Sequence, residues 1–163
     1  MAALTHDRNT QYSLGDLLAI PVGGGEQIFT GSLVCSNANG YAVPAEDAAG
    51  YKFEGVATER ADNRLGSDGD MSVVVRRRGR FRFACLSILN QSALGAAVYA
   101  ADDQTLAADA AEVTNDIGVG VIDKVEGTHD CWISIDEAVL KGKEWTEPTT
   151  TTVAPATTTT TGA

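Results

Sequence analysis

The two residues of this chain whose types and spacing come nearest to a catalytic pair are His129 and Cys131. Positions two apart in a strand lie on the same face, and a histidine beside a cysteine can remove the thiol proton to create a nucleophile. Such a pair also needs a third group that orients the histidine, and the sequence offers no evident one. We therefore interpret the pair as an edge histidine beside a core cysteine, and we predict that the protein is not an enzyme.

Glycine-rich and acidic segments are the next candidates for a binding site. Residues 23–25 are all glycine, but no Lys-Ser/Thr follows them and the next segment has the pattern of a strand, unlike a phosphate loop. Gly118 and Gly120 lie within an apolar strand pattern, which favours close packing over a dinucleotide site. Calcium ligands are a further possibility, but the spacing departs from the EF-hand pattern and favours a plain acidic turn; these residues are Asp62, Asp68 and Asp70. We predict no cofactor and no metal.

Cysteine content and charge narrow the function classes. The three cysteines, Cys35, Cys85 and Cys131, are too few and too scattered for a disulfide framework or a metal site. They fit buried thiols in a protein folded in a reducing cytosol.

The 22 acidic and 12 basic residues give a net charge of −10, which argues against nucleic-acid and anionic-membrane partners. With no secretory signal and no apolar run of about 18 to 20 residues, we expect a protein made in the cytoplasm.

Short apolar runs separated by turn residues extend over residues 16–135 and predict strands. The expected strands are residues 17–22, 27–35, 41–43, 51–58, 71–86, 96–100, 117–125 and 131–135. The last two should pair with each other. The helix candidates, residues 107–113 and 136–140, are short. This pattern predicts an all-β fold, a small barrel or sandwich, with an extended N-terminal arm at residues 1–15, a barrel-like domain at 16–140 and a Thr/Pro/Ala-rich flexible tail at 141–163.

The expected strand at residues 71–86 has an unusual composition. Its odd positions are apolar or small apart from Arg77, while its even positions carry arginines spaced about 7 Å apart over roughly 20 Å: Arg76, Arg78, Arg80 and Arg82. Gly79 indicates a bulge or bend in the middle. The arginines could contact acidic groups on a partner or a second copy, or pair with acidic side chains on neighbouring strands of the same chain. No aromatic residues suited to base stacking interleave with them.

The order of short segments along the chain resembles the capsid cement, or decoration, proteins of tailed bacteriophages. The segments that carry this resemblance are residues 31–34, 40–44, 50–57, 73–83, 98–106, 117–120 and 131–135. Each is a weak strand and turn pattern, and the specificity lies in their order and spacing. The resemblance covers roughly residues 15–135 and leaves out the arm and the tail.

The resemblance implies a β-barrel-like or β-tulip-like module on the outer surface of the virion. Such proteins bridge neighbouring major capsid protein subunits, commonly as homotrimers, and stabilise the expanded shell. In this class the N-terminal arm often adds to a capsid sheet. We therefore expect capsid or inter-subunit contacts from Leu4, His6, Arg8, Tyr12, Arg76, Arg78, Arg80 and Arg82.

Two other functions stay open at this point. In the first, the protein is a head fibre or adhesin-like module whose Thr-rich tail displays or forms a binding surface. In the second, it is a small hydrolase or processing enzyme encoded with the capsid, and only the pair of His129 and Cys131 supports that function.

Overall fold

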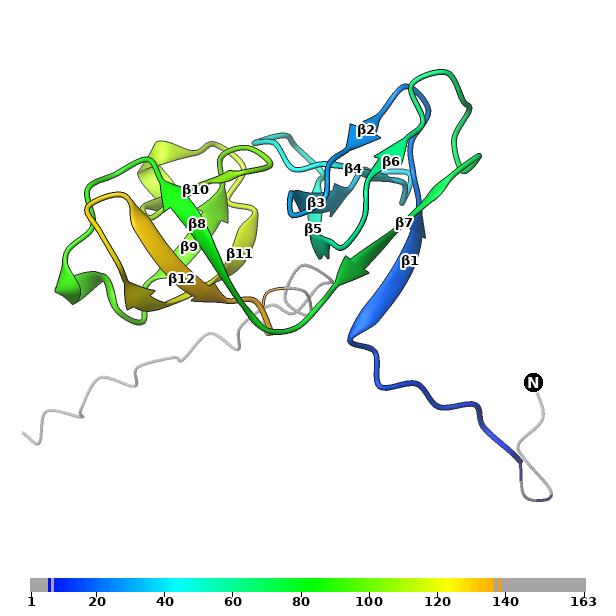
Figure 1. Ribbon diagram of the computed structural model, residues 1–163, viewed down its shortest axis with the longest axis horizontal. Helices are drawn as coiled ribbons and strands as arrows, with labels where there is room; N and C mark the ends of the chain where they lie inside the picture. The colour runs from blue at the N-terminus through cyan, green and yellow to red at the C-terminus, as the bar shows by residue number, and fades with distance from the viewer. Residues whose placement is uncertain (1–5, 7, 137, 139–163) are drawn as a thin grey trace, which may run out of the picture.

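The computed structural model describes residues 6, 8–136 and 138, and strands dominate them (Figure 1). These strands are β1 (Leu17–Pro21), β2 (Gln27–Ile28), β3 (Leu33–Ser36), β4 (Ala42–Pro44), β5 (Lys52–Ala57), β6 (Ala61–Asp62), β7 (Ser72–Arg76), β8 (Arg80–Cys85), β9 (Ala97–Ala100), β10 (Thr105–Ala107), β11 (Gly118–Val125) and β12 (Asp130–Ser134). Two short 3₁₀ helices are η1 (Gln91–Ala93) and η2 (Ala110–Glu112). The predicted all-β fold is confirmed.

The strands form an open sheet, a closed barrel and a small ribbon. The open sheet is antiparallel and has the order β1-β7-β5-β3-β4, and the ribbon pairs β2 with β6. The barrel has the order β10-β8-β12-β11-β9, with β10 and β8 parallel and the other pairs antiparallel. In Figure 1 the barrel and the open sheet lie side by side, and the chain crosses from one to the other between β7 and β8. The predicted pairing of the last two strands is confirmed as β11 with β12.

The prediction of one long strand at residues 71–86 is wrong. The segment contains β7 in the open sheet and β8 in the barrel, with a bend between them. Gly79 lies in this bend with φ of +115°, which only glycine adopts readily. The alternation of apolar residues continues through the bend because both strands bury one face, but in different cores. Val73 and Val75 pack in one cluster, and Phe83 and Cys85 pack in another.

The core consists of two apolar clusters on opposite faces of the open sheet. The larger cluster joins side chains of the open sheet, such as Leu33 and Phe53, to the interior of the barrel, for example Val98 and Ile133. The smaller cluster lies between the other sheet face and the β2-β6 ribbon and includes Ile28. Most of these side chains are fully buried, so the barrel and the open sheet share a continuous apolar core.

Two further predictions about elements need correction. The strand expected at residues 27–35 is interrupted by a turn at Gly31, whose φ is +84°, and gives β2 and β3. The helix expected at residues 107–113 is only the single 3₁₀ turn η2, which Asp109 and Glu112 cap; a helix this short is costly to nucleate. The helix candidate at 136–140 and the tail at 141–163 lie mostly or wholly outside the described residues. Within the described residues, no helix is long and apolar enough to cross a bilayer.

Candidate functional site

The arginines singled out in the sequence do not form one stripe, because they belong to two sheets and the bend between them. Arg76 ends β7, Arg78 lies in the bend, and Arg80 and Arg82 belong to β8. All four side chains are exposed. On β8 the alternation holds, since Phe83 points into the core while its neighbour Arg82 points outward.

Three of these arginines have acidic partners in the same chain. Arg78 lies 3.7 Å from Asp16, Arg80 lies 2.7 Å from Asp123, and Arg82 contacts Asp130 at 3.3 Å and Glu126 at 3.7 Å. In the described part of the chain, no ion pair involves Arg76. Arg78, Arg80 and Arg82 therefore pair with acidic side chains of the same chain. Each pair is solvent-exposed and stabilises the fold by no more than about 1 kcal/mol. Such pairs can exchange for a partner's carboxylates at little cost.

Arg77 is the one charged residue among the apolar or small odd positions of residues 71–86, and its contacts in the structure explain this placement. Its guanidinium lies 3.7 Å from the carboxylate of Glu54, which is 5% exposed in β5. The same carboxylate accepts a hydrogen bond of 2.9 Å from the Ser36 hydroxyl. A buried carboxylate needs such partners, so Arg77 serves the interior of the open sheet rather than its surface.

The arm is exposed and carries apolar side chains. Residues 8–15 have no regular secondary structure, and Figure 1 shows this segment running away from the body before β1 begins. Tyr12 is 86% exposed and Leu14 is 72% exposed. Leu17 and Leu18 continue this exposed apolar run into β1, which is an edge strand of the open sheet. His6 and Arg8 are also exposed, while Leu4 lies outside the described residues.

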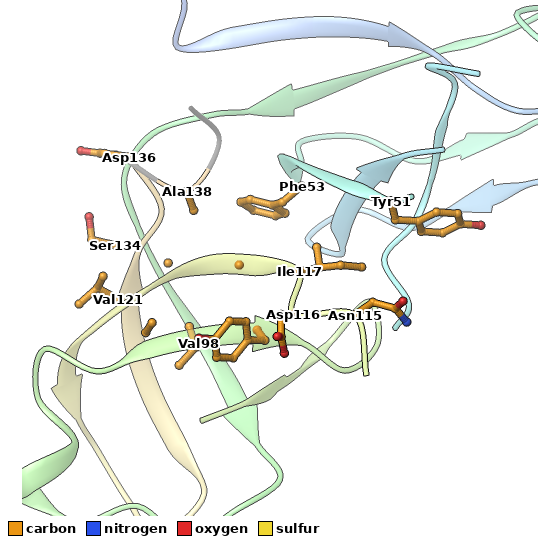
Figure 2. Close-up of a pocket in the computed structure, with 14 residues that line it drawn as sticks. Tyr51, Phe53, Val98, Asn115, Asp116, Ile117, Val121, Ser134, Asp136 and Ala138 are labelled. Carbon is orange, nitrogen blue, oxygen red and sulfur yellow. The ribbon is translucent and has the colours of Figure 1, made fainter. Parts of the chain in front are cut away.

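A cavity of about 690 Å³ lies between the open sheet and the barrel. Figure 2 shows Tyr51 and Phe53 on the side of the open sheet, and Val98 and Ile117 on the side of the barrel. Ala138 forms part of the wall, next to residues outside the described part of the chain. No local sequence pattern predicts this cavity, because its walls come from segments far apart in the chain.

Two of the polar residues that line this cavity, Asp136 and Asn115, make structural contacts. The Asp136 carboxylate accepts a hydrogen bond of 2.7 Å from the Gly79 amide, and the Asn115 side chain donates to Asp47 at 2.9 Å. Among the described residues that line the cavity there is no histidine, cysteine or lysine. Ser134 and the carboxylates of Asp116 and Asp136 also line the cavity, and no described hydrogen bond joins the Ser134 hydroxyl to either carboxylate.

His129 and Cys131 are not arranged as a catalytic pair. His129 precedes β12 and is exposed, and its Nδ1 lies 3.1 Å from the carbonyl oxygen of Cys85. Cys131 is fully buried, and its sulfur lies 3.2 Å from the sulfur of Cys85. The interpretation of an edge histidine beside a core cysteine agrees with this arrangement. Whether the protein is an enzyme stays a matter of prediction.

The acidic segment at residues 62–70 behaves as a set of turns. Asp68 accepts a hydrogen bond of 2.7 Å from the Gly24 amide, and Asp70 accepts one of 2.7 Å from the Ser67 amide. A hydrogen bond from the Arg64 guanidinium lowers the pKa of Asp62 to about 2. Across the described residues, no three His, Cys, Asp or Glu side chains are grouped to hold a metal ion.

The connection between Asp47 and residues 114–115 escaped the sequence analysis. The Asp47 carboxylate accepts hydrogen bonds from the backbone amides of Thr114 at 2.6 Å and Asn115 at 2.8 Å. These hydrogen bonds lower the pKa of Asp47, and the bond from the Thr114 amide has the largest effect. They join a loop of the open sheet to a loop of the barrel. An aspartate and an asparagine 68 positions apart carry no local pattern that would reveal the contact.

Comparisons with protein-family models, with curated proteins and with solved structures find no match to this chain.

Proposed function

We propose that the protein is a structural virion component that binds the outer surface of a bacteriophage capsid. In this proposal a homotrimer bridges neighbouring major capsid protein subunits and stabilises the expanded shell. Two things support the proposal: the order of segments that resembles capsid cement proteins, and an all-β body with an exposed arm. The observation that carries it is the exposed arm, with Tyr12 and Leu14 exposed on it, that leads directly into an edge strand.

The arm and β1 together have the properties of a strand-addition site. An edge strand has backbone N–H and C=O groups without a partner on its outer side, and an extended segment of another chain can pair there. Tyr12, Leu14 and Leu17 expose large apolar surfaces next to this edge. Exposed apolar residues beside an open edge favour association with another surface. We propose that this surface belongs to the capsid.

The exposed arginines supply a second type of contact in this proposal. Arginine pairs with carboxylates through two parallel hydrogen bonds and loses less hydration energy than lysine. Arg78, Arg80 and Arg82 give up only weak internal pairs when they turn to an acidic surface. A trimer that makes several such contacts at once gains affinity by multivalency, even if each contact is weak.

The test compares two matched exposed side chains. Leu14→Ala removes an apolar side chain from the arm, and Ile88→Ala removes one of almost equal exposure, 73%, from the barrel. Each variant is mixed with emptied, expanded capsids assembled from the major capsid protein of the same virus, and bound protein is measured by co-sedimentation. We expect Leu14→Ala to weaken binding about tenfold or more, since one lost apolar anchor costs at least about 1 to 2 kcal/mol. Ile88→Ala should leave binding unchanged.

Two further variants separate the arm from the arginines. Deletion of residues 1–11 removes most of the arm without touching the body, and replacement of Arg76, Arg78 and Arg80 by Gln removes charge from the surface. Analytical ultracentrifugation of the unbound variants reports trimer formation independently of capsid binding. Equal capsid occupancy for the wild type, the deletion and Leu14→Ala would refute the role of the arm. Unchanged trimer formation and binding in the arginine variant would leave those residues with intramolecular roles only.

The alternative function, a head fibre or adhesin-like module, depends on the Thr-rich segment. Residues 148–163 lie outside the described part of the chain. A glycan-binding screen of the full chain and of a chain ending at residue 147 tests this alternative directly, because only the full chain should bind if the tail is responsible.

A further inference from the structure

Two of the three cysteines meet inside the barrel. Cys85 ends β8, and Cys131 lies in the neighbouring antiparallel strand β12. Their register is diagonal, since Cys131 lies opposite Phe83 and the Cys85 amide donates to the carbonyl oxygen of His129 at 2.7 Å. Both side chains point into the core, and their sulfurs are 3.2 Å apart.

We propose that Cys85 and Cys131 form a disulfide that closes across the barrel when the protein meets an oxidant of the peroxide class. A disulfide has a sulfur–sulfur length of about 2.05 Å, so the two sulfurs need to approach by only about 1.2 Å. Closing this gap requires rotation of both side chains and requires the Cα atoms of the two diagonal positions to come within about 7 Å of each other. The bond would join β8 to β12 covalently in addition to their backbone hydrogen bonds.

The hydrogen bond between the two thiols prepares one of them for reaction. The contact with the Cys85 thiol lowers the pKa of Cys131, and the same contact together with burial raises the pKa of Cys85. The thiolate is the reactive form of cysteine. Both thiols are buried, and we place the entry of the oxidant at the end of β8, where the neighbouring residues Leu86 and His129 are exposed.

The chemistry balances with one equivalent of hydrogen peroxide. The Cys131 thiolate attacks one peroxide oxygen, the O–O bond breaks, and the leaving hydroxide takes up a proton to become water. This leaves a sulfenic acid on Cys131. The Cys85 sulfur then attacks the Cys131 sulfur, the S–O bond breaks, and the departing hydroxide accepts the Cys85 proton to become a second water. Two thiols are oxidised, and the peroxide receives both electrons.

Cys35 provides an internal control, because it is buried without a cysteine partner among the described contacts. It lies in β3 of the open sheet, and burial, with the charges of Glu54 and Glu46, raises its pKa to about 12. A thiol in this state is a poor nucleophile. The folded protein should therefore oxidise at Cys85 and Cys131 and leave Cys35 as a free thiol.

The experiment counts free thiols by mass. The reduced full-length protein is treated with hydrogen peroxide, unfolded in urea, labelled with N-ethylmaleimide and analysed by intact mass spectrometry. The untreated protein should take up three labels, one for each cysteine, and the oxidised protein only one. Peptide mapping should place the bond between residues 85 and 131, and dithiothreitol should restore three labels.

Two controls make the result specific to the fold. Cys35→Ala should form the bond as the wild type does, whereas oxidation of the chain in urea should give a mixture of the three possible pairings. The proposal is overturned if the folded protein keeps three free thiols, if a bond involves Cys35 or a second chain, or if oxygen is added to Cys131 without loss of the Cys85 thiol. All of these outcomes are read from the wild type or from Cys35→Ala, so the result does not depend on whether variants of the paired cysteines fold.

Discussion

Substitution of Gly120 by alanine provides a sharp test of how β11 packs against β12. A Cβ atom at Gly120 would lie 2.3 Å from the carbonyl oxygen of Ser134. That oxygen belongs to the backbone of the paired strand and cannot rotate away. To reach an ordinary contact distance the two strands would have to separate by about 1 Å, because non-bonded carbon contacts lie near 3.5 Å.

The cost follows from two effects. Overpacking of a well-packed site costs about 1 to 3 kcal/mol, and weakening a ladder hydrogen bond adds about 1 kcal/mol. We therefore expect Gly120→Ala to lower the free energy of unfolding by about 2 to 4 kcal/mol, a large part of the stability of a domain. Gly118 is the matched control. It lies two positions earlier in the same strand, and a Cβ there would meet nothing within 4 Å.

The assay is urea unfolding of both variants and the wild type, followed by far-UV circular dichroism. Gly118→Ala should be neutral or stabilising by up to about 1 kcal/mol, since alanine restricts the unfolded chain more than glycine does. If Gly120→Ala unfolds at the same urea concentration as Gly118→Ala, the close approach of β11 to β12 is wrong, and so is the register that places Ser134 opposite Val121.

Three further predictions test contacts elsewhere in the chain. The pKa of Asp47 is lowered in the folded protein. Its contribution to stability is therefore complete above about pH 4 and is lost as the pH falls through the folded pKa. Asp47→Ala should weaken the dependence of the urea midpoint on pH below about pH 4. The exposed pair of Arg80 and Asp123 should show a coupling energy below about 1 kcal/mol in a double-mutant cycle with Arg80→Gln and Asp123→Asn, and a larger value would contradict its exposure. In a variant with alanine at both other cysteines, Cys35 should react with a chromogenic disulfide reagent at pH 8 only after unfolding, and a fast reaction in the folded state would show that its burial is wrong.

The strand content could be predicted from the sequence because it is encoded locally. Alternation of apolar and polar residues, with glycine and asparagine at the turns, identified most of the strands and the pairing of β11 with β12. The division of residues 71–86 between two sheets could not be read in the same way. The apolar residues keep the same parity on both sides of Gly79, so the pattern carries no mark of the change of partner strand.

The candidate contact residues also divide into those that local sequence predicts and those that depend on residues far apart in the chain. Exposure of the arm could be expected from its polar, aperiodic sequence, and the structure agrees for the described positions, such as Arg8 and Tyr12. The cavity, the Asp47 loop contact and the meeting of Cys85 with Cys131 depend on pairs of residues far apart in the chain. The spacing of the cysteines in the sequence does not predict that Cys85 and Cys131 meet, because β8 and β12 become neighbours only when the barrel closes.

The bend between β7 and β8 contacts three parts of the protein: the arm, the open sheet and the barrel. The amide of Arg77 donates to the carbonyl oxygen of Asp16 at the base of the arm, and the guanidinium of Arg78 pairs with the Asp16 side chain. One residue later, the Gly79 amide donates to Asp136 at the end of the barrel. The bend of three residues therefore contacts the base of the arm, the open sheet and the barrel. Arg77 and Arg78 of this bend contact Asp16 at the base of the arm, and Arg80 and Arg82 of β8 face outward along the barrel.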